Sequence, residues 1–453
     1  MSSTKPLNIL ISGSGICGPS CAYWLHRFLP TAQITIIERS PEPRLGGQAV
    51  DLRSACVPIV RKMGLLEMVK EKNTTEMGME FVYLDTKRKA LFPKTGEEER
   101  QSGKIPTPTC HTRTQTNTLQ PVTSEYEILR GDLAEILYNT TKSLPNVAYI
   151  FDETITSITQ VDTPGLPTAA EVTFKNSHLP PSTYDLVIGA DGQMSRTRRL
   201  IFGHGPKNDD YLHRLGQYSA LFTIPRDPTM DNEYAQWYNA PGGRLFLLRP
   251  DPYGTTRAYL SVTDKNLSRF DEIDELLRTG TRAQQQAWFE REFKDAGYQT
   301  ERCLSAMIKA DDFYMQQIAQ VRMPQWSKGC CVLVGDAAYC PSPISGVGTA
   351  AAIVGSYVLA GEVAKSLHDI PAALREYERV TRGFVDKAQR LVPGAPQIAN
   401  PQSVWGIRVL NAVTGVLASR FVQGLGGLVG RLFPAFGGTT AWCPPEYEGV
   451  KGV

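Results

Sequence analysis

Histidine is scarce in this chain of 453 residues, which contains only six. No two of them stand in an HxH, HxxH or HExxH spacing, and these are spacings that catalytic metal sites use. Net charge is scarce as well, because 48 basic residues against 46 acidic ones leave only +2. Nucleic acid and anionic membranes select for clustered Lys and Arg. The sequence therefore predicts no metal site and no nucleic-acid partner, and favours a small-molecule partner.

A long uncharged run is also missing from the apolar tail of the chain. In the apolar tail over residues 404–433 the longest one, residues 409–419, has eleven residues, whereas a helix that crosses a bilayer needs about twenty. We expect this tail to form a helix that bridges two domains, the alternative being a peripheral helix on a membrane surface. The amino terminus has no charged start followed by a long apolar core, so we expect no secretion signal.

Cysteine usage and composition indicate an intracellular globular protein. The nine cysteines are odd in number and lie mostly in apolar segments, which suits a reduced interior and a cytoplasmic location. With 42% apolar residues, 21% charged residues and a mean hydropathy of −0.24, the chain is neither disordered nor fibrous. Its length favours two or three domains with buried cores, and we expect a monomer or a weak dimer.

The strongest local pattern lies in the first forty residues. The apolar run Leu7–Ile11 is followed by glycines at positions 13, 15 and 18 and by a helical stretch over residues 19–28. In such a strand–turn–helix unit Gly13 allows the tight turn, and Gly15 lets a pyrophosphate approach the backbone. Gly18 lets the helix pack closely on the strand. The unit predicts a dinucleotide site.

An acidic residue follows at the expected distance. A second apolar strand, residues 33–37, ends at Glu38, twenty residues beyond Gly18. A carboxylate there is placed to accept both hydroxyls of an adenosine ribose. Strand, glycines, helix, strand and acid at this spacing support the dinucleotide site, but they do not choose between FAD and NAD.

Two later segments again join an apolar strand to a turn. Residues 184–188 lead into Gly189-Ala190-Asp191-Gly192, and residues 332–334 lead into a block that starts with Gly335-Asp336 and continues through Pro343 to Gly346-Val347-Gly348. With the glycine loop, these blocks resemble in type and order the group A flavin-dependent monooxygenases, the para-hydroxybenzoate hydroxylase-like family, over residues 7–390. The resemblance selects FAD as the bound cofactor.

The resemblance implies roles for these blocks. Asp336 is expected to hydrogen-bond the ribityl or ribose part of FAD, and Asp191 is a further cofactor-binding candidate. Pro343, Gly346, Val347 and Gly348 are expected to bring the backbone against the flavin ring. A helix that opens at Val347 points its free N–H groups at the flavin, which stabilises the anionic reduced form.

A third site element follows from residues 126–133. This stretch resembles the arginine-bearing helix start of the family, whose guanidinium reaches FAD, and Arg130 is the candidate; the alternative is a surface arginine. Asp132 is expected to cap the same helix.

A narrower resemblance concerns residues 38–52, which are similar to the same stretch of the tetracycline-inactivating monooxygenases within the family. It implies that Asp51 contacts FAD, that Arg39 lies near the adenine or its phosphates, and that Arg44 contacts NADPH. Tyr218 and Arg244 align loosely with substrate-contacting positions of that group, with a solvated turn as the alternative for Arg244.

Two departures from the family pattern stand in the last block. Many members have a histidine where this chain has Tyr339, and an asparagine where it has Ala350. Mechanisms that use those side chains are therefore not expected here.

The scattered cofactor blocks imply an α/β fold with a discontinuous Rossmann-like FAD-binding domain. We expect this domain over residues 1–78, 125–210 and 319–395, an inserted β-sheet substrate domain over residues 79–124 and 211–318, and a C-terminal helical tail over residues 396–453. Strands in the substrate domain are expected at 217–224, 242–248 and 257–262, with a hairpin at 79–84 and 89–92 and polar helices at 272–277 and 283–293. Residues 95–124 are expected to form a long loop, either a lid or an excursion.

The expected function is that of an FAD-dependent monooxygenase. The resemblance implies that NADPH or NADH reduces bound FAD, that O2 then forms a flavin C4a-hydroperoxide, and that one oxygen atom passes to a small organic substrate by hydroxylation, epoxidation or Baeyer–Villiger insertion in secondary metabolism. The flavin carries this chemistry, so no side chain is expected to be catalytic. The alternatives are an FAD-dependent oxidase or cyclase without external reductant, and a non-catalytic flavoprotein that sequesters a ligand.

Overall fold

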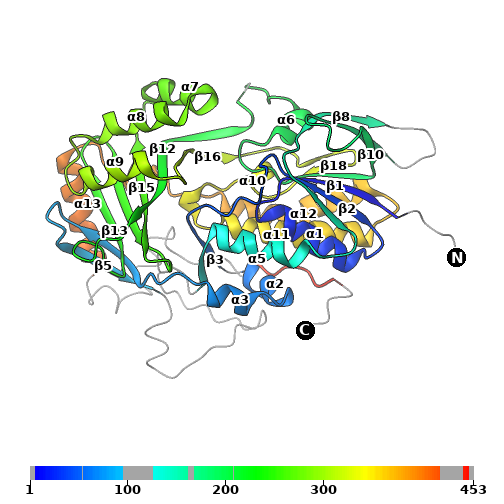
Figure 1. Cartoon of the computed structure of the whole chain (residues 1–453), viewed down its shortest axis with the longest axis horizontal. Helices are drawn as coiled ribbons and strands as arrows, with labels where there is room; N and C mark the ends of the chain where they lie inside the picture. Colours follow the sequence, from blue (N-terminus) through cyan, green and yellow to red (C-terminus); the bar gives the residue numbers. More distant parts are fainter. Residues whose placement is uncertain are drawn as a thin grey trace.

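The computed structural model describes residues 6–53, 55–94, 126–161, 168–207, 209–418 and 442–447. Two large sheets lie side by side in it: Figure 1 shows β1, β2 and β18 on the right with α1, α11 and α12, and β12, β13 and β15 on the left beneath α7, α8 and α9. Residues 95–124, where the sequence predicts a long loop, lie outside the described residues.

A six-stranded sheet forms the first part, in the order β17-β18-β11-β1-β2-β7. All neighbours pair in parallel except β17, which is antiparallel to β18. Runs of buried apolar residues on both faces explain this arrangement, since parallel strands are covered by helices on each side. The strands are β1 (Asn8–Ser12), β2 (Gln33–Ile37), β7 (Val147–Ile150), β11 (Leu186–Gly189), β17 (Ser327–Lys328) and β18 (Cys331–Leu333).

Helices pack on this sheet and on each other. Helix α1 contacts α11, and α11 contacts α12; the rings of Trp24 and Tyr357 meet edge to face with centroids 4.8 Å apart at the first of these contacts. The helices of this part are α1 (Cys17–Phe28), α2 (Cys56–Lys62), α3 (Leu66–Glu71), α5 (Arg130–Thr141), α6 (Arg196–Phe202), α10 (Asp336–Tyr339), α11 (Gly348–Lys365) and α12 (Ile370–Ala388).

Two small sheets complete the first part. One is antiparallel in the order β10-β9-β8, and the other pairs β3 with β6. The β3–β6 ladder matters for the site because β6 runs directly into α5. The strands are β3 (Ala49–Leu52), β6 (Tyr126–Leu129), β8 (Ile155–Val161), β9 (Ala169–Phe174) and β10 (Ser182–Tyr184).

A seven-stranded sheet forms the second part, in the order β16-β12-β15-β14-β13-β4-β5. The predicted hairpin is present as β4 and β5 and joins the sheet through a parallel pairing of β4 with β13. The sequence missed β13 and β16. The strands are β4 (Gly78–Val82), β5 (Arg88–Pro93), β12 (Leu212–Pro225), β13 (Ala235–Ala240), β14 (Arg244–Pro250), β15 (Thr255–Thr263) and β16 (Tyr314–Val321).

One face of this sheet is covered by helices α7 (Asp271–Thr279), α8 (Arg282–Phe293) and α9 (Thr300–Lys309). Side chains alternate between the faces of a strand, and Tyr218, Ala220 and Phe222 share the buried core with these helices. The intervening residues, such as Ser219 and Leu221, therefore lie on the opposite side, which we call the inner face. The predicted helices α7 and α8 are present, and α9 was missed.

The tail differs from the expected bridging helix. Helix α13 (Val404–Leu417) contacts β5 and β13 of the seven-stranded sheet. Contacts with the first part come instead from Tyr447, whose ring lies 5.8 Å from that of Phe28 and 5.1 Å from that of Tyr357. Residues 419–433 of the expected helix lie outside the described residues.

Seven of the nine cysteines are buried free thiols. Cys443 is disulfide-bonded, so the expectation of reduced cysteines fails at that position. Among the described residues, no helix combines the length and apolar character needed to cross a membrane.

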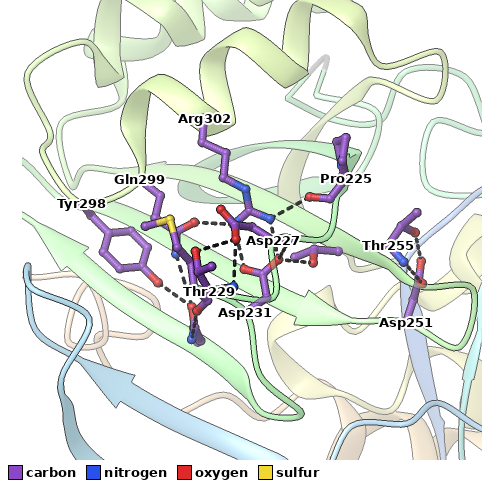
Figure 2. Close-up of polar contacts among 12 residues, drawn as sticks. Pro225, Asp227, Thr229, Asp231, Asp251, Thr255, Tyr298, Gln299 and Arg302 are labelled. Atoms are coloured by element: carbon purple, nitrogen blue, oxygen red, sulfur yellow. Dashed lines mark hydrogen bonds and ion pairs between the residues drawn. The ribbon is translucent and has the colours of Figure 1, made fainter.

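A buried polar network ties α9 to the sheet (Figure 2). Asp231, in the connection between β12 and β13, accepts hydrogen bonds from Arg302 of α9, at 2.7 Å for Nη1, and from the Thr256 hydroxyl at 2.8 Å. The Asp231 side chain is only 5% exposed and that of Arg302 is 19% exposed. The charge of Asp231 is therefore compensated mainly by Arg302 rather than by water.

This dependence predicts the effect of Asp231→Ala. Removing one partner of a buried ion pair leaves the other uncompensated, which costs about 3 kcal/mol. The loss should appear as a lower urea midpoint in tryptophan fluorescence, to which Trp288, a buried core residue of α8, contributes. Arg379→Ala is the control, because its pair with Glu376 is 71% and 41% exposed and such pairs contribute about 0–1 kcal/mol. Equal effects of the two substitutions would contradict the assignment.

Candidate cofactor site

The glycine loop after β1 is held in a conformation that only glycine accepts. Gly13 has φ +109°, and a Cβ there would lie 2.5 Å from the carbonyl oxygen of Ala190. A Cβ on Gly18 would lie 1.9 Å from the carbonyl oxygen of Gly13. These contacts agree with the predicted roles of both residues, a tight turn and a close helix–strand approach.

Arg130 lies over this loop. A Cβ on Gly15 would stand 3.1 Å from Arg130 Nη2, so the guanidinium faces the loop backbone. Arg130 begins α5, and its N–H donates to the carbonyl oxygen of Gln48 at 2.9 Å. Next to it, a Cβ on Gly131 would lie 1.6 Å from the carbonyl oxygen of Leu45, which leaves room only for glycine.

The prediction that Asp132 caps helix α5 was wrong. Leu129 is the N-cap residue of α5 and no side chain caps it. Asp132 instead accepts a hydrogen bond from the Tyr253 hydroxyl at 2.7 Å, because the β14–β15 turn lies within reach of its side chain.

Glu38 stands at the end of β2, beside the glycine loop. One carboxylate oxygen accepts from the backbone N–H of Ser14 at 2.9 Å, and the other accepts from the N–H of Ser40 at 3.1 Å. The carboxylate is thus fixed against the loop, at the position that the sequence assigned to a ribose.

Three arginines converge near the loop. The pKa of the Arg44 guanidinium is lowered by desolvation and by the positive charges of Arg130 and Arg39, and the negative Glu38 opposes this shift. Like charges at close range repel one another unless an anion lies between them. The cluster therefore suits a polyanionic group such as a pyrophosphate.

Residues 336–348 lie near the same glycine loop and Arg130. Desolvation raises the pKa of the Asp336 carboxyl, and hydrogen bonding to Cys340 and the charge of Arg130 counter it. A Cβ on Gly348 would lie 3.9 Å from Asp336 Oδ1, and one on Gly346 would lie 3.9 Å from Asp51 Oδ2. Asp51 also pairs with Arg53 at 2.8 Å. Chain segments far apart in sequence thus meet around one site.

Helix α11 opens into this region. Val347 is its N-cap residue, Gly346 before it has φ +65°, and the first turn contains no acidic side chain. Pro343 is exposed, and Val347 and Gly348 are partly exposed. The free N–H groups of the 18-residue helix carry a partial positive charge of about half a unit, which favours an electron-rich ligand edge.

Asp191, a predicted cofactor residue, makes hydrogen bonds at the start of α6. One carboxylate oxygen accepts from the Ser195 hydroxyl, and the other accepts from the N–H and the hydroxyl of Thr197, both at 2.9 Å. These bonds hold the start of α6. The side chain is therefore engaged in the helix start, and only its Cα lies against Gly13.

Sequence reasoning missed Arg198. It is fully buried, and its guanidinium donates to the carbonyl oxygens of Ala337 at 2.9 Å and Gln193 at 2.7 Å. It thereby links the Asp191 turn to the Asp336 block. The signal available in the sequence was only its place seven residues after Asp191, which carries no chemistry by itself.

Tyr339 points away from the site. Its hydroxyl lies 3.0 Å from that of Tyr377 in the core, and a Cβ on Gly355 would lie 1.9 Å from it. Tyr339, which stands where many family members have a histidine, thus packs its phenol ring against α11.

The two substrate candidates lie on the helix-covered face of the seven-stranded sheet. Tyr218 is buried against Phe270, with ring centroids 5.0 Å apart. Arg244 donates to the carbonyl oxygens of Pro241 at 2.7 Å and Glu292 at 2.9 Å. Both were expected to meet substrate, but strand alternation directs them toward α7 and α8 instead.

The geometry of the glycine loop, Arg130 and the start of α11 is suited to binding FAD. A glycine-rich loop, an arginine over it and an open helix N-terminus provide the features that a dinucleotide needs. Buried polar atoms also lack partners at this place in the described structure, namely the Ser14 hydroxyl and both amide atoms of Gln48. A polar ligand would satisfy such atoms. The described residues hold no cluster of metal-ligating side chains.

Comparison with known proteins agrees with this site. A family model described as "FAD binding domain" matches residues 7–391. The flavin-dependent monooxygenase eupH of Phoma sp is 36% identical over 91% of this chain and 92% of its own length. The monooxygenase CTB7 of Cercospora beticola is 32% identical over 90% of this chain and 92% of its own length.

Solved structures show the same fold. The tetracycline destructase Tet(55) superposes with a TM-score of 0.70 at 28% identity, over 98% of this chain and 99% of its own. A salicylate hydroxylase in complex with substrate has a TM-score of 0.61 at 17% identity, over 94% of this chain and 98% of its own, which shows the shared fold. With a family match over residues 7–391, the chain belongs to the FAD binding domain family of flavin-dependent monooxygenases.

Proposed function

We propose that this flavin monooxygenase consumes NADPH or NADH and inserts one oxygen atom of O2 into a small organic substrate. The observation that carries the proposal is the convergence of Arg130, the Gly15 backbone, Asp336 and the N-terminus of α11 around one site. No other cluster in the described residues joins a dinucleotide loop to an open helix end in this way.

FAD is proposed to lie along this convergence. Its adenosine ribose would meet Glu38, its pyrophosphate would meet Gly15, Arg39 and Arg130, and its ribityl chain would meet Asp336. Asp51 and the segment Pro343–Gly348 would face the ring. When bound, FAD supplies the redox chemistry, taking two electrons from the nicotinamide and activating O2.

The residues of the chain provide placement and charge. Backbone N–H groups at the start of α11 stabilise negative charge on the reduced ring edge. Arg198 keeps the Ala337 segment fixed to the Asp191 turn, which sets the approach of the ring to that helix. Arg44 is an exposed member of the arginine cluster, and we propose it as the contact for the phosphate of NADPH.

The substrate side is proposed to be the inner face of the seven-stranded sheet. Arg130 and Arg44 both act on the pKa of Tyr314, a residue of that face in β16, so the inner face lies near the cofactor site. Relatives named as fungal monooxygenases support a role in secondary metabolism. Separate hydrophobic cores for the two large sheets support the division into a cofactor and a substrate domain; a cytoplasmic location and a monomer or weak dimer remain proposals.

Arg130→Ala should weaken FAD binding. Losing charge-assisted hydrogen bonds to phosphate costs about 1.5–3 kcal/mol, or about ten- to a hundredfold in Kd. Titration of the apoprotein with FAD, followed by flavin fluorescence, measures this loss. Arg278→Ala is the control, because Arg278 lies on exposed α7 with its side chain 67% exposed.

Arg130→Lys should restore only part of the affinity, because a lysine keeps the charge but not the planar donor pair. Unchanged FAD affinity in Arg130→Ala would remove this arginine from the cofactor site.

Reduction by a nicotinamide cofactor tests the proposed function itself. Anaerobic mixing of the FAD-loaded protein with NADPH or NADH should bleach the flavin, because electrons pass from the nicotinamide to the ring. Admission of isotopically labelled O2 with a substrate should then place one labelled atom in the product. A flavin that stays oxidised with both nicotinamides, while O2 is consumed with substrate alone, would identify an oxidase instead.

A further inference from the structure

A buried glutamine connects the seven-stranded sheet to the segment that precedes α11. Gln320 lies near the end of β16, and its side chain is completely buried. Its Nε2 donates to the carbonyl oxygen of Pro341 at 3.0 Å and to that of Gln389 at 2.8 Å. Pro341 stands between Asp336 and Pro343 in the sequence, two residues that the proposed function assigns to the cofactor site.

Arg322 fixes the orientation of this amide. Its Nε and Nη2 both donate to Gln320 Oε1, at 2.9 Å and 2.6 Å. A guanidinium can only donate and a backbone carbonyl can only accept, so the amide oxygen must face Arg322 and the amide nitrogen must face the two carbonyls. The Gln320 side chain therefore has one orientation in which both ends of its amide are hydrogen-bonded.

A second glutamine holds the residues just before Pro341. Gln389 follows the end of α12. Its Nε2 donates to the carbonyl oxygens of Val321 at 2.6 Å and Tyr339 at 3.1 Å. The backbone N–H of Val321 donates to the carbonyl oxygen of Cys340 at 3.0 Å. The end of β16 and residues 339–341 are thus joined by a continuous set of hydrogen bonds.

The residue after Pro341 has a strained backbone. Ser342 has φ +80° and ψ +146°, close to a region of conformation that is essentially restricted to glycine. Its carbonyl oxygen accepts from the N–H of Ser345 at 3.1 Å and from the Ser345 hydroxyl at 2.8 Å. Such a conformation persists only where the surrounding structure fixes it. The hydrogen bond from Gln320 to Pro341 is one of the constraints that do so.

The Ser342 turn leads directly into the start of α11. A Cβ on Gly348, the first residue of that helix, would lie 3.9 Å from Pro341 Cγ as well as from Asp336 Oδ1. The Pro341 ring therefore lies beside the first turn of α11, whose free N–H groups we propose to face the flavin. Movement of Pro341 would change the position of these N–H groups relative to the flavin ring.

We infer that Gln320 is a positioning residue for the flavin. Held in one orientation by Arg322, its amide fixes the Pro341 carbonyl, and through the Ser342 turn it determines where the N–H groups of α11 lie. The inference rests on the FAD site of the proposed function. It gives β16, a strand of the seven-stranded sheet, a share in setting the redox properties of the cofactor.

The test replaces Gln320 with methionine, which is similar in length and has no amide. The redox equilibrium between the FAD-loaded full chain and a reference dye is measured anaerobically with a chemical reductant. The equilibrium constant for FAD reduction should fall about three- to tenfold in Gln320→Met, because displaced helix N–H groups stabilise the anionic reduced flavin less. The affinity for oxidised FAD should change less, since Arg130 and the glycine loop keep their places.

Gln286→Met is the matched control. Gln286 of α8 is also buried, and its Nε2 donates to the carbonyl oxygen of Met307 at 2.8 Å. Met307 belongs to the core between the seven-stranded sheet and its helices, away from the flavin segment. This substitution should lower the urea midpoint without shifting the dye equilibrium. An equal shift in both variants, or no shift in Gln320→Met, would overturn the inference.

Arg322→Ala tests the same inference without a change in the core, and it decides the matter if Gln320→Met does not fold. Arg322 is exposed, and its loss removes both donors from the amide oxygen of Gln320. The dye equilibrium should shift in the same direction as in Gln320→Met, by a smaller factor, because the amide is no longer held in one orientation. An unchanged equilibrium in Arg322→Ala contradicts the inference.

Reduction by a nicotinamide on the same samples separates the inference from the proposed function. The dye equilibrium needs only a chemical reductant, so a wild-type flavin that NADPH and NADH both leave oxidised refutes the proposed function, while the shift in Gln320→Met still decides the inference. A flavin that NADPH reduces, with the same dye equilibrium in the wild type and all variants, refutes the inference alone.

Discussion

The position of the Arg130 guanidinium over the backbone of Gly15 is the contact on which the cofactor site depends. It exists because β6 ends where α5 begins, and because β6 is fixed to β3 by an antiparallel ladder. Gly131 has no Cβ, and a Cβ there would lie 1.6 Å from the carbonyl oxygen of Leu45, so the chain before β3 can pass close to α5. The proposed contact of Arg130 with the cofactor therefore depends on strand pairing well away from the glycine loop, as much as on the loop itself.

Strand β6 also contacts the seven-stranded sheet through an ion pair. Glu127 lies within β6, three residues before Arg130, and it holds Arg249 of β14. The ion pair with Arg249 and the arginine over the glycine loop are thus built on one short segment.

Strand alternation corrected the substrate candidates. Tyr218 and Arg244 resembled substrate-contacting positions, but a shift of one residue along a strand moves a side chain to the other face of a sheet. The resemblance was too loose to fix register within one residue. Residues such as Tyr259 and Trp237 lie on the inner face, and neither carries a sequence pattern that marks it as functional. Strands β13 and β16 were missed for a related reason, because the buried Gln236 and Gln317 are satisfied by tertiary hydrogen bonds.

The sequence by itself determined the dinucleotide unit, since Gly13, Gly15, Gly18 and Glu38 act through backbone conformation and spacing that lie within forty residues. It also determined the α/β class and the FAD family, because apolar strands and glycine turns are local features. Only the tertiary structure decided which side chains surround the site. Arg198, the neutralised Arg249 and the inward turn of Tyr339 depend on partners more than thirty residues away, and hydrogen bonds over such separations leave no periodic trace in the chain.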